Sequence, residues 1–451
     1  MSKDARALHA CVASKWGARA TALAVIATVL VIWLIAKVLV IPHREVADAF
    51  TFGLIVAGLA LTFSSWLGKT SARLGLGLLV IVAALAVFTT MPFNPVRGAG
   101  SFEGVILLLL GIGQLRAYLD RQDIKGRIER ALSHPAVRRS ARPIFLLYSA
   151  MAFFLSLATV PIVGSLTRST RLNHLYHLRL AMRAVGATMF IAPTTAGAAA
   201  VSAMFPELSW SQALLTGLPL ALLCLLFTRS EKEPAIELAP AEKDGASHGL
   251  MLPLAIFISV IVVGKLLLGY ATVTTVALAV SITGAVSLLV KYGIAELART
   301  IGDGFQRSSA EILLFIACGA LQVALGAPET AQVFSPLSGD FKLLLSSAPV
   351  QLLLILGLMP LLTIIGIHPM ILFAAAFPVF HPITQLPVTV EYQAWIAMFM
   401  ISQLISPVSI SAVTAAASVN ESPWKVSFES HAMFALAFAL GGFLYMTGIA
   451  G

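Results

Sequence analysis

Apolar windows of about twenty residues recur along the whole of this 451-residue chain. A helix rises about 1.5 Å per residue, so each window matches the hydrocarbon core of a bilayer. The windows predict helices, because lipid-exposed backbone groups must be paired and because the sequence lacks the short alternating strands of a β-barrel. With 58% hydrophobic and only 11% charged residues, the sequence predicts an all-α integral membrane protein that crosses the bilayer many times.

About eleven windows predict transmembrane helices. They are 21–41, 47–67, 74–91, 103–118, 185–205, 211–227, 250–270, 272–290, 309–326, 392–418 and 428–448. A cytoplasmic N-terminus with the first helix (1–46) precedes a first repeat (47–227), and a polar cytoplasmic linker (228–249) joins this repeat to a second one (250–451).

Two further apolar segments predict re-entrant hairpins. Segment 143–166 is interrupted by "SLATVP" and has basic residues on both flanks, which predicts that it enters and leaves by the same face. We expect its tip between Ser156 and Pro161. Segment 350–380 is interrupted at "GIHPM". Ahead of the first hairpin, 116–142 carries eight Lys/Arg and predicts an amphipathic helix on the cytoplasmic surface.

Collinear identities relate the two repeats. "APTTAGAAAVSAMFPELSW" (192–210) aligns with "SPVSISAVTAAASVNESPW" (406–424), and "EGVILLLLGIGQ" (103–114) aligns with "EILLFIACGALQ" (311–322). The paired residues include Glu103 with Glu311, Gly111 with Gly319, Pro161 with Pro369 and Trp210 with Trp424. Five crossings per repeat is an odd number, so the repeats are predicted to have inverted topology.

The basic residues predict the orientation. A cytoplasmic N-terminus and an outer C-terminus put 25 of the 30 Lys/Arg on the inside of a plasma membrane of the bacterial inner-membrane kind. This explains the net charge of +9 without a nucleic-acid partner. The three cysteines are scattered singly and predict neither a disulfide framework nor a thiolate metal site.

Each repeat contains a helix broken by proline and hydroxyl residues, at "APTT" (192–195) and "SPVS" (406–409). Unwound backbone is costly in hydrocarbon unless it faces protein, water or a ligand. Helix N-termini suit an anion, helix C-termini and loop carbonyls suit Na⁺, and the hydroxyls can bind either an anion or a cation. The alternative is that the breaks only kink helices and permit close packing.

We predict that the two breaks and the two hairpin tips form one pseudo-symmetric binding site. The candidate residues are Thr159, Pro161, Pro193, Thr194, Thr195, His368, Pro369, Pro407, Ser409, Ser411 and Thr414.

Several side chains have two interpretations. In one interpretation His368 binds the solute or carries a coupled proton. In the other it is a hydrogen-bonded structural histidine. Glu103 and Glu311 begin paired spans, so they either stabilise helix N-termini or serve in coupling or gating. Trp210 and Trp424 are interpreted as interfacial anchors.

The order of hairpin, broken helix and closing helix, duplicated in inverted sense, resembles the ion transporter superfamily. That group includes divalent-anion/sodium symporters, citrate carriers and arsenite permeases. Where those symporters carry Ser-Asn-Thr at each hairpin tip, this chain has "LATVP" and "GIHPM". The resemblance implies a homodimeric scaffold and a hairpin domain that moves as an elevator.

The sequence therefore predicts a secondary active transporter of a small, carboxylate-like anion, coupled to H⁺ or Na⁺ and without a bound organic cofactor. One alternative is a permease subunit or lipid translocator that needs a partner. A membrane enzyme is disfavoured, because no HExxH or paired-Asp motif is present.

Overall fold

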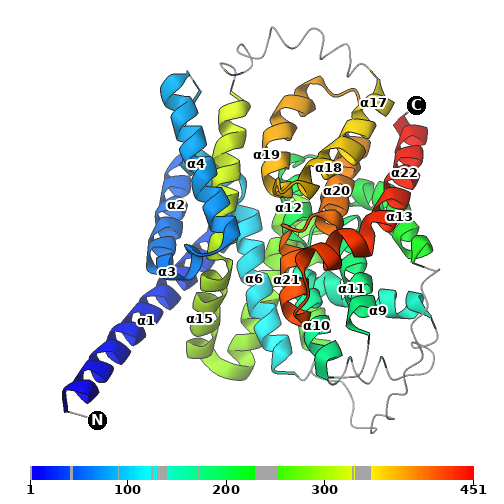
Figure 1. The fold of residues 1–451 in the computed structure, drawn as a ribbon. Helices are drawn as coiled ribbons and strands as arrows, with labels where there is room; N and C mark the ends of the chain where they lie inside the picture. The colour runs from blue at the N-terminus through cyan, green and yellow to red at the C-terminus, as the bar shows by residue number, and fades with distance from the viewer. Residues whose placement is uncertain are drawn as a thin grey trace.

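The computed structural model describes residues 3–40, 44–89, 91–122, 140–169, 173–228, 251–327 and 347–450, together with residues 126, 128, 132 and 330. Within these ranges the regular structure is entirely helical (Figure 1). Seven helices are long and apolar enough to cross a membrane, or eight if one bent pair is a single span, and five shorter apolar helices accompany them. The prediction of an all-α polytopic membrane protein is confirmed.

Helices correspond to all eleven predicted spans. In the first repeat and the helix before it they are α1 (Lys3–Val40), α2 (Arg44–Leu61), α3 (Phe63–Trp66), α4 (Thr70–Phe88), α6 (Glu103–Asp120), α11 (His174–Met189), α12 (Ala196–Met204) and α13 (Trp210–Phe227). A further helix, α5 (Pro95–Ser101), lies between α4 and α6. In the second repeat they are α14 (Met251–Val262), α15 (Thr272–Leu325), α20 (Val388–Ile405), α21 (Ile410–Val419) and α22 (Ser430–Ala450), with short π-helical turns before α15 (Val263–Leu267) and before α22 (Lys425–Glu429).

Both predicted hairpins are helix–break–helix segments. The first consists of α9 (Ala141–Leu155), a 3₁₀ turn (Ser156–Ala158) and α10 (Thr159–Ser169). The second consists of α17 (Ala348–Leu353), a π turn (Leu354–Leu358), α18 (Met359–Ile364) and α19 (Pro369–Phe380), followed by a 3₁₀ turn (His381–Ile383). Figure 1 shows α9 and α10 in the lower half of the molecule and α17–α19 in the upper half, as inverted repeats require.

Two predicted boundaries differ from the structure. The broken helix predicted at 185–205 begins earlier, with α11 at His174. Predicted spans 272–290 and 309–326 lie in two successive helices, Thr272–Tyr292 and Ile294–Leu325, which share the label α15 and are separated at Gly293 (φ 82°), so the second helix begins well before residue 309. Helix α5 was not predicted. It meets α6 at a bend of 58°. Linker 228–249 and most of the basic segment 116–142 lie outside the described residues.

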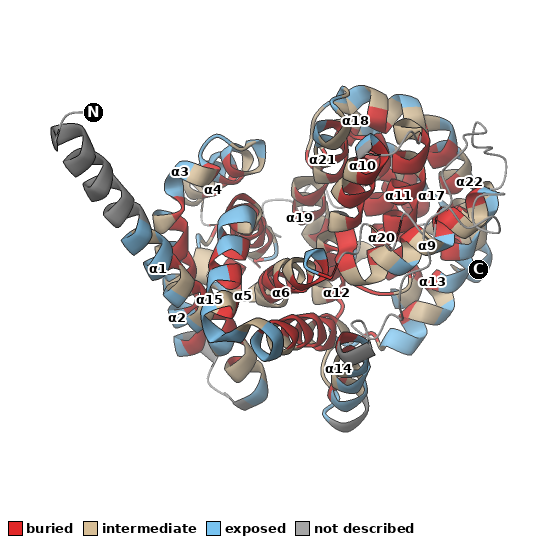
Figure 2. Cartoon of the chain, turned by 90° about the horizontal axis from the view of Figure 1, so that it is seen from below, coloured by how far each residue is buried: buried red, intermediate tan, exposed pale blue. Residues whose placement is uncertain are grey.

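The helices form two groups that pack mainly within themselves. The scaffold group comprises α1–α6, α14 and α15, in which α15 packs against α1, α4, α5, α6 and α14. The hairpin group comprises α9–α13 and α17–α22, with α11 and α20 at its centre. The main contacts between the groups are α15 with α19 and α6 with α12. Figure 2 shows the groups side by side, with α12 and α19 between them.

Paired glycines allow very close helix packing in the scaffold group. A β-carbon on Gly319 of α15 would overlap the Gly98 carbonyl of α5, at 2.7 Å from its carbon atom. A β-carbon on Gly111, the repeat-related residue, would lie 2.8 Å from the backbone nitrogen of Ser281. Only glycine fits at these two positions without backbone movement.

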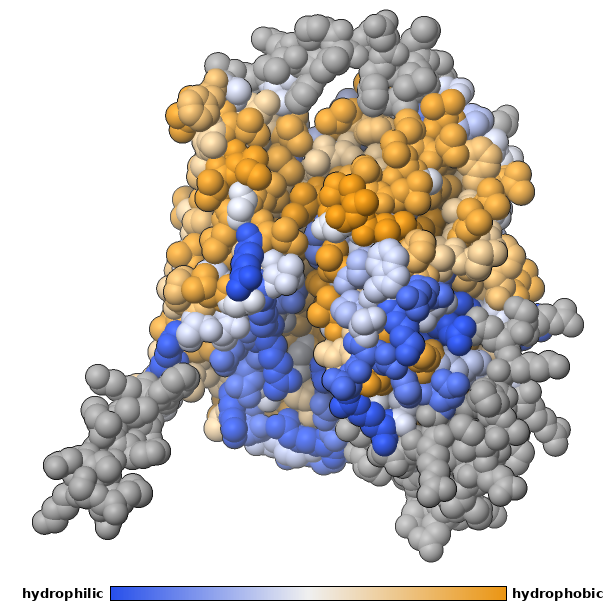
Figure 3. Space-filling view, viewed as in Figure 1, coloured by the Kyte–Doolittle hydropathy of each residue, from blue (hydrophilic) through white to orange (hydrophobic). Residues whose placement is uncertain are grey.

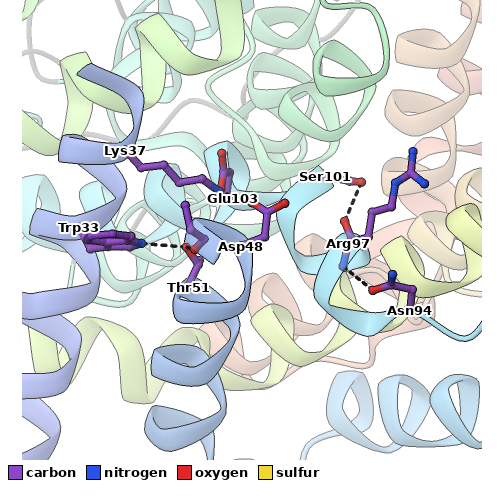
Figure 4. Close-up of polar contacts among 9 residues, drawn as sticks. Trp33, Lys37, Asp48, Thr51, Asn94, Arg97, Ser101 and Glu103 are labelled. Carbon is purple, nitrogen blue, oxygen red and sulfur yellow. Dashed lines mark hydrogen bonds and ion pairs between the residues drawn. The ribbon is translucent and has the colours of Figure 1, made fainter. Parts of the chain in front are cut away.

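A buried ion cluster joins three scaffold helices (Figure 4). The Lys37 ammonium on α1 contacts the carboxylates of Asp48 on α2 and Glu103 on α6. Nearby, the Trp33 indole donates to the Thr51 hydroxyl at 3.1 Å, which ties α1 to α2 a second time. Because the lysine is shielded from solvent, these contacts fix the mutual positions of α1, α2 and α6.

Candidate functional site

The tip of the second hairpin is a sharp turn stabilised by glycine, histidine and proline. Gly366 has φ +104°, a left-handed conformation that glycine adopts without strain. His368 is the N-cap of α19 and Pro369 its first residue, where a missing N–H costs nothing. The local sequence "GIHPM" therefore ends α18 and starts α19 within a few residues.

His368 uses only one of its ring nitrogens for capping. Its Nδ1 accepts a hydrogen bond from the Met370 N–H at 3.2 Å. Because Nδ1 holds a lone pair, the proton of the neutral ring is on Nε2. This Nε2 is buried and has no hydrogen-bond partner among the described residues. His368 is thus a structural cap that also retains an unused N–H donor.

The second broken helix lies against this tip. The Ser406 hydroxyl, just after α20, donates to the Thr363 carbonyl of α18 at 2.9 Å. After Pro407, Ser409 caps α21 by accepting from the Ala412 N–H at 3.2 Å, and it donates to the Gln403 carbonyl at 2.9 Å. These bonds satisfy the ends of the interrupted helix, so the break is a built feature of the fold.

A cavity of about 350 Å³ lies between this corner of the hairpin group and the scaffold group. From the hairpin group it is lined by His368, Pro407, Val408, Ile410, Val413 and Thr414, and from the scaffold group by Gly68, Lys69, Thr70, Ser71 and Glu311. Figure 3 shows hydrophobic residues over the upper part of one face and hydrophilic residues gathered in its lower part, where the two groups meet. The volume suits a small organic solute.

The two charged groups on the cavity wall belong to the scaffold. Lys69, between α3 and α4, donates from its ammonium to the Arg307 carbonyl of α15 at 2.8 Å. Glu311 lies on α15, and its buried Oε2 has no hydrogen-bond partner in the described part of the chain. The residues that line this solute-sized space therefore include a lysine, a glutamate and a histidine.

The helix-capping interpretation of Glu311 is wrong. The second part of α15 begins at Ile294, so Glu311 lies well inside the helix, far from any N-terminus. Glu103, its repeat-related counterpart, does begin α6 and pairs with Lys37. The two carboxylates that the predicted repeat pairs therefore lie in different environments, and of the two only Glu311 lines the cavity.

The first hairpin tip and the first break contribute no wall to this cavity. Thr195 caps α12 by accepting from the Ala198 N–H at 3.2 Å. Thr159 at the first hairpin tip and Thr194 in the first break are both buried, and neither hydroxyl has a partner among the described residues. Thus four of the predicted residues, His368, Pro407, Thr414 and Glu311, come together at one cavity. The remaining nine, Thr159, Pro161, Pro193, Thr194, Thr195, Pro369, Ser409, Ser411 and Glu103, do not line it.

Trp210 supports the first break directly. Its indole N–H donates to the Ile191 carbonyl at 2.9 Å, and this carbonyl belongs to the unwound segment between α11 and α12. Trp424, the repeat-related tryptophan, instead packs on Phe428 with ring centroids 4.8 Å apart. The interfacial-anchor interpretation therefore missed a hydrogen bond that Trp210 makes to the break.

Replacing Trp210 with phenylalanine is expected to lower the free energy of unfolding by about 1 kcal/mol, because the Ile191 carbonyl loses its donor. The measurement is the thermal unfolding midpoint of the purified protein. Trp424→Phe is the matched control and is expected to change the midpoint less. Equal shifts for the two variants would contradict the assigned role of the indole N–H.

Sequence reasoning missed the scaffold wall. Residues 68–71 connect two apolar windows and read as an ordinary polar loop. Nothing in their local sequence indicates that they face a hairpin tip about three hundred residues later in the chain. Among the described residues no cluster of His, Cys, Asp or Glu has the geometry of a metal site.

The described residues form an all-α polytopic membrane protein with helix–break–helix segments and interrupted helices. No family model and no curated protein matches the chain. Among solved structures, it is similar to the YdaH transporter of Alcanivorax borkumensis, whose crystal structure is described as having an unusual topology. The two share 15% identity over 84% of this chain and 97% of that chain, with a TM-score of 0.56. The likeness shows that the two chains share a fold, whereas membership of the ion transporter superfamily stays a prediction.

Proposed function

We propose that the protein is a secondary active transporter of a small, carboxylate-like anion, coupled to H⁺ or Na⁺. The observation that carries this proposal is the cavity at the second hairpin tip, which is lined by His368, the N-cap of α19, together with Lys69. An anion in this cavity would gain hydrogen bonds from His368 and charge complementarity from Lys69. The N-terminal end of α19 adds partial positive charge.

Glu311 supplies the coupling in this proposal. An ionised carboxylate in the cavity repels an anionic solute, and a proton or Na⁺ bound to Glu311 removes that repulsion. By linkage, the anion then strengthens binding of the coupling ion by the same factor. Solute and ion therefore bind together, which is the requirement for symport.

In the remaining parts of the proposal, the orientation follows from the basic residues of the sequence, and the homodimer and the elevator stroke follow from the resemblance to the ion transporter superfamily. The protein is placed in a plasma membrane of the bacterial inner-membrane kind with its N-terminus in the cytoplasm. It acts as a homodimer through the scaffold group, and the hairpin group moves against that scaffold in an elevator stroke. Figure 1 draws the start of α1 and the end of α22 at opposite ends of the molecule, which is compatible with an odd number of crossings.

The direct test uses purified protein in liposomes under an imposed proton or sodium gradient. A series of mono- and dicarboxylates is offered, and accumulation of radiolabelled solute is measured. Accumulation of one class of carboxylate that requires either gradient supports the proposal. Absence of accumulation with every carboxylate under both gradients, from protein whose helical content is intact by circular dichroism, would contradict it.

Glu311→Gln is expected to uncouple solute binding from the ion. The amide is neutral at every pH, so the variant should bind the anion as the protonated protein does, and its affinity should be the same at pH 6 and pH 8. Wild-type protein is expected to bind more tightly at pH 6, or more tightly in Na⁺ than in K⁺. Thermal stabilisation by the anion measures these affinities. A Glu311→Gln protein that retains the wild-type pH and Na⁺ dependence would exclude Glu311 as the coupling residue.

A further inference from the structure

The wall of the cavity is divided between two separately packed bodies. His368 and residues 407–414 belong to the hairpin group, whereas Lys69 and Glu311 belong to the scaffold group. Helices α15 and α19 provide the main contact between the groups. Any rigid-body displacement of one group against the other therefore changes the distance from His368 to Lys69.

Each half of the wall is fixed within its own body. His368 is held by the Met370 N–H, and the following break is tied to α18 through Ser406. Lys69 is held by the Arg307 carbonyl of α15, which is a contact inside the scaffold group. The ammonium therefore stays with the scaffold, and the imidazole stays with the hairpin tip.

We propose that Lys69 is a state-specific contact: it binds the solute in the arrangement described here and loses it when the hairpin group moves, whereas His368 keeps the solute in both arrangements. This inference rests on the proposed transport function. It assigns to Lys69 a state-specific role that the transport function alone does not require. Lys69 consequently sets the affinity on one face of the membrane and biases the loaded carrier toward that face.

The physical reason is differential binding. A contact that exists in only one of two conformations stabilises that conformation by its whole binding energy, while a contact present in both shifts no equilibrium. Removing Lys69 should therefore weaken solute binding on one face and leave the other face unchanged. Removing the His368 donor should weaken binding on both faces.

The test is solute exchange in liposomes that contain protein of one orientation, with the opposite side saturated with solute. The half-saturating concentration is measured on each face for wild type, Lys69→Gln, Lys69→Arg and His368→Asn. Arg73→Gln is the matched control, because Arg73 is exposed, lies one turn further along α4 and does not line the cavity.

We expect Lys69→Gln to raise the half-saturating concentration about tenfold on one face and less than about twofold on the other, since hydrogen bonds to charged groups have effects of this size. Lys69→Arg should restore most of the affinity on that face, and Arg73→Gln should resemble wild type. His368→Asn should raise the value on both faces.

Equal increases on both faces for Lys69→Gln would overturn the inference. It would also be overturned if Lys69→Gln acted on neither face while His368→Asn acted on both, and in that case the proposed transport site would stand. If neither substitution changed the half-saturating concentration, the cavity would not be the solute site, and the proposed function would fail together with the inference.

Discussion

Replacing His368 with asparagine is expected to reduce solute transport at least about tenfold while the protein remains folded. Asparagine is a good N-cap, so its side chain can still accept from the first turn of α19. It is too short to present an N–H where His368 Nε2 lies. The substitution removes a hydrogen bond between a neutral donor and a charged solute. Such a bond typically contributes about 1.5–3 kcal/mol, which corresponds to a loss of transport of about tenfold or more.

The measurement is the initial rate of gradient-driven uptake, compared with the thermal unfolding midpoint of the same preparation. His368→Ala is the companion variant, because it removes the cap as well as the donor. It should lose transport and should also lower the midpoint, by roughly 1 kcal/mol of unfolding free energy. Wild-type uptake by His368→Asn would show that the imidazole serves α19 alone.

Replacing Gly319 with alanine is expected to destabilise the scaffold group strongly. The added β-carbon would overlap the backbone carbonyl of Gly98, and a backbone atom cannot move aside as a flexible side chain can. Overpacking of this kind costs roughly 1–3 kcal/mol or more, and the separation of α5 from α15 would extend the loss to neighbouring contacts. We expect a lower thermal midpoint and reduced yield of folded protein.

Gly77→Ala is the matched control for this prediction. Gly77 lies on the exposed side of α4, and a β-carbon there would meet no atom within 4 Å. The same chemical change should therefore be neutral or stabilise by roughly 0.5–1 kcal/mol, because alanine favours the helix. A midpoint for Gly319→Ala equal to that of Gly77→Ala would contradict the close helix contact at Gly98.

Predictions from local sequence succeeded where the physical cause is itself local. Apolar windows define helices because the bilayer leaves the backbone no other way to pair its polar groups. Proline and a capping residue interrupt helices wherever they occur, so "APTT", "SPVS" and "GIHPM" could be recognised as breaks without knowing what surrounds them. The duplication of this order also indicated inverted topology.

Only the tertiary structure decided which of these features meet. The repeat predicts that Glu103 and Glu311 are equivalent, yet one pairs with Lys37 and the other lines a cavity, because their neighbours come from non-equivalent helices. His368 could be recognised from the sequence as a candidate, whereas Lys69 could not, since its position beside the hairpin tip depends on how α4 packs on α15. The sequence by itself determined the membrane class, the helices and their breaks, since these depend on neighbours in the chain. The cavity and its charge pattern were decided by packing between segments hundreds of residues apart.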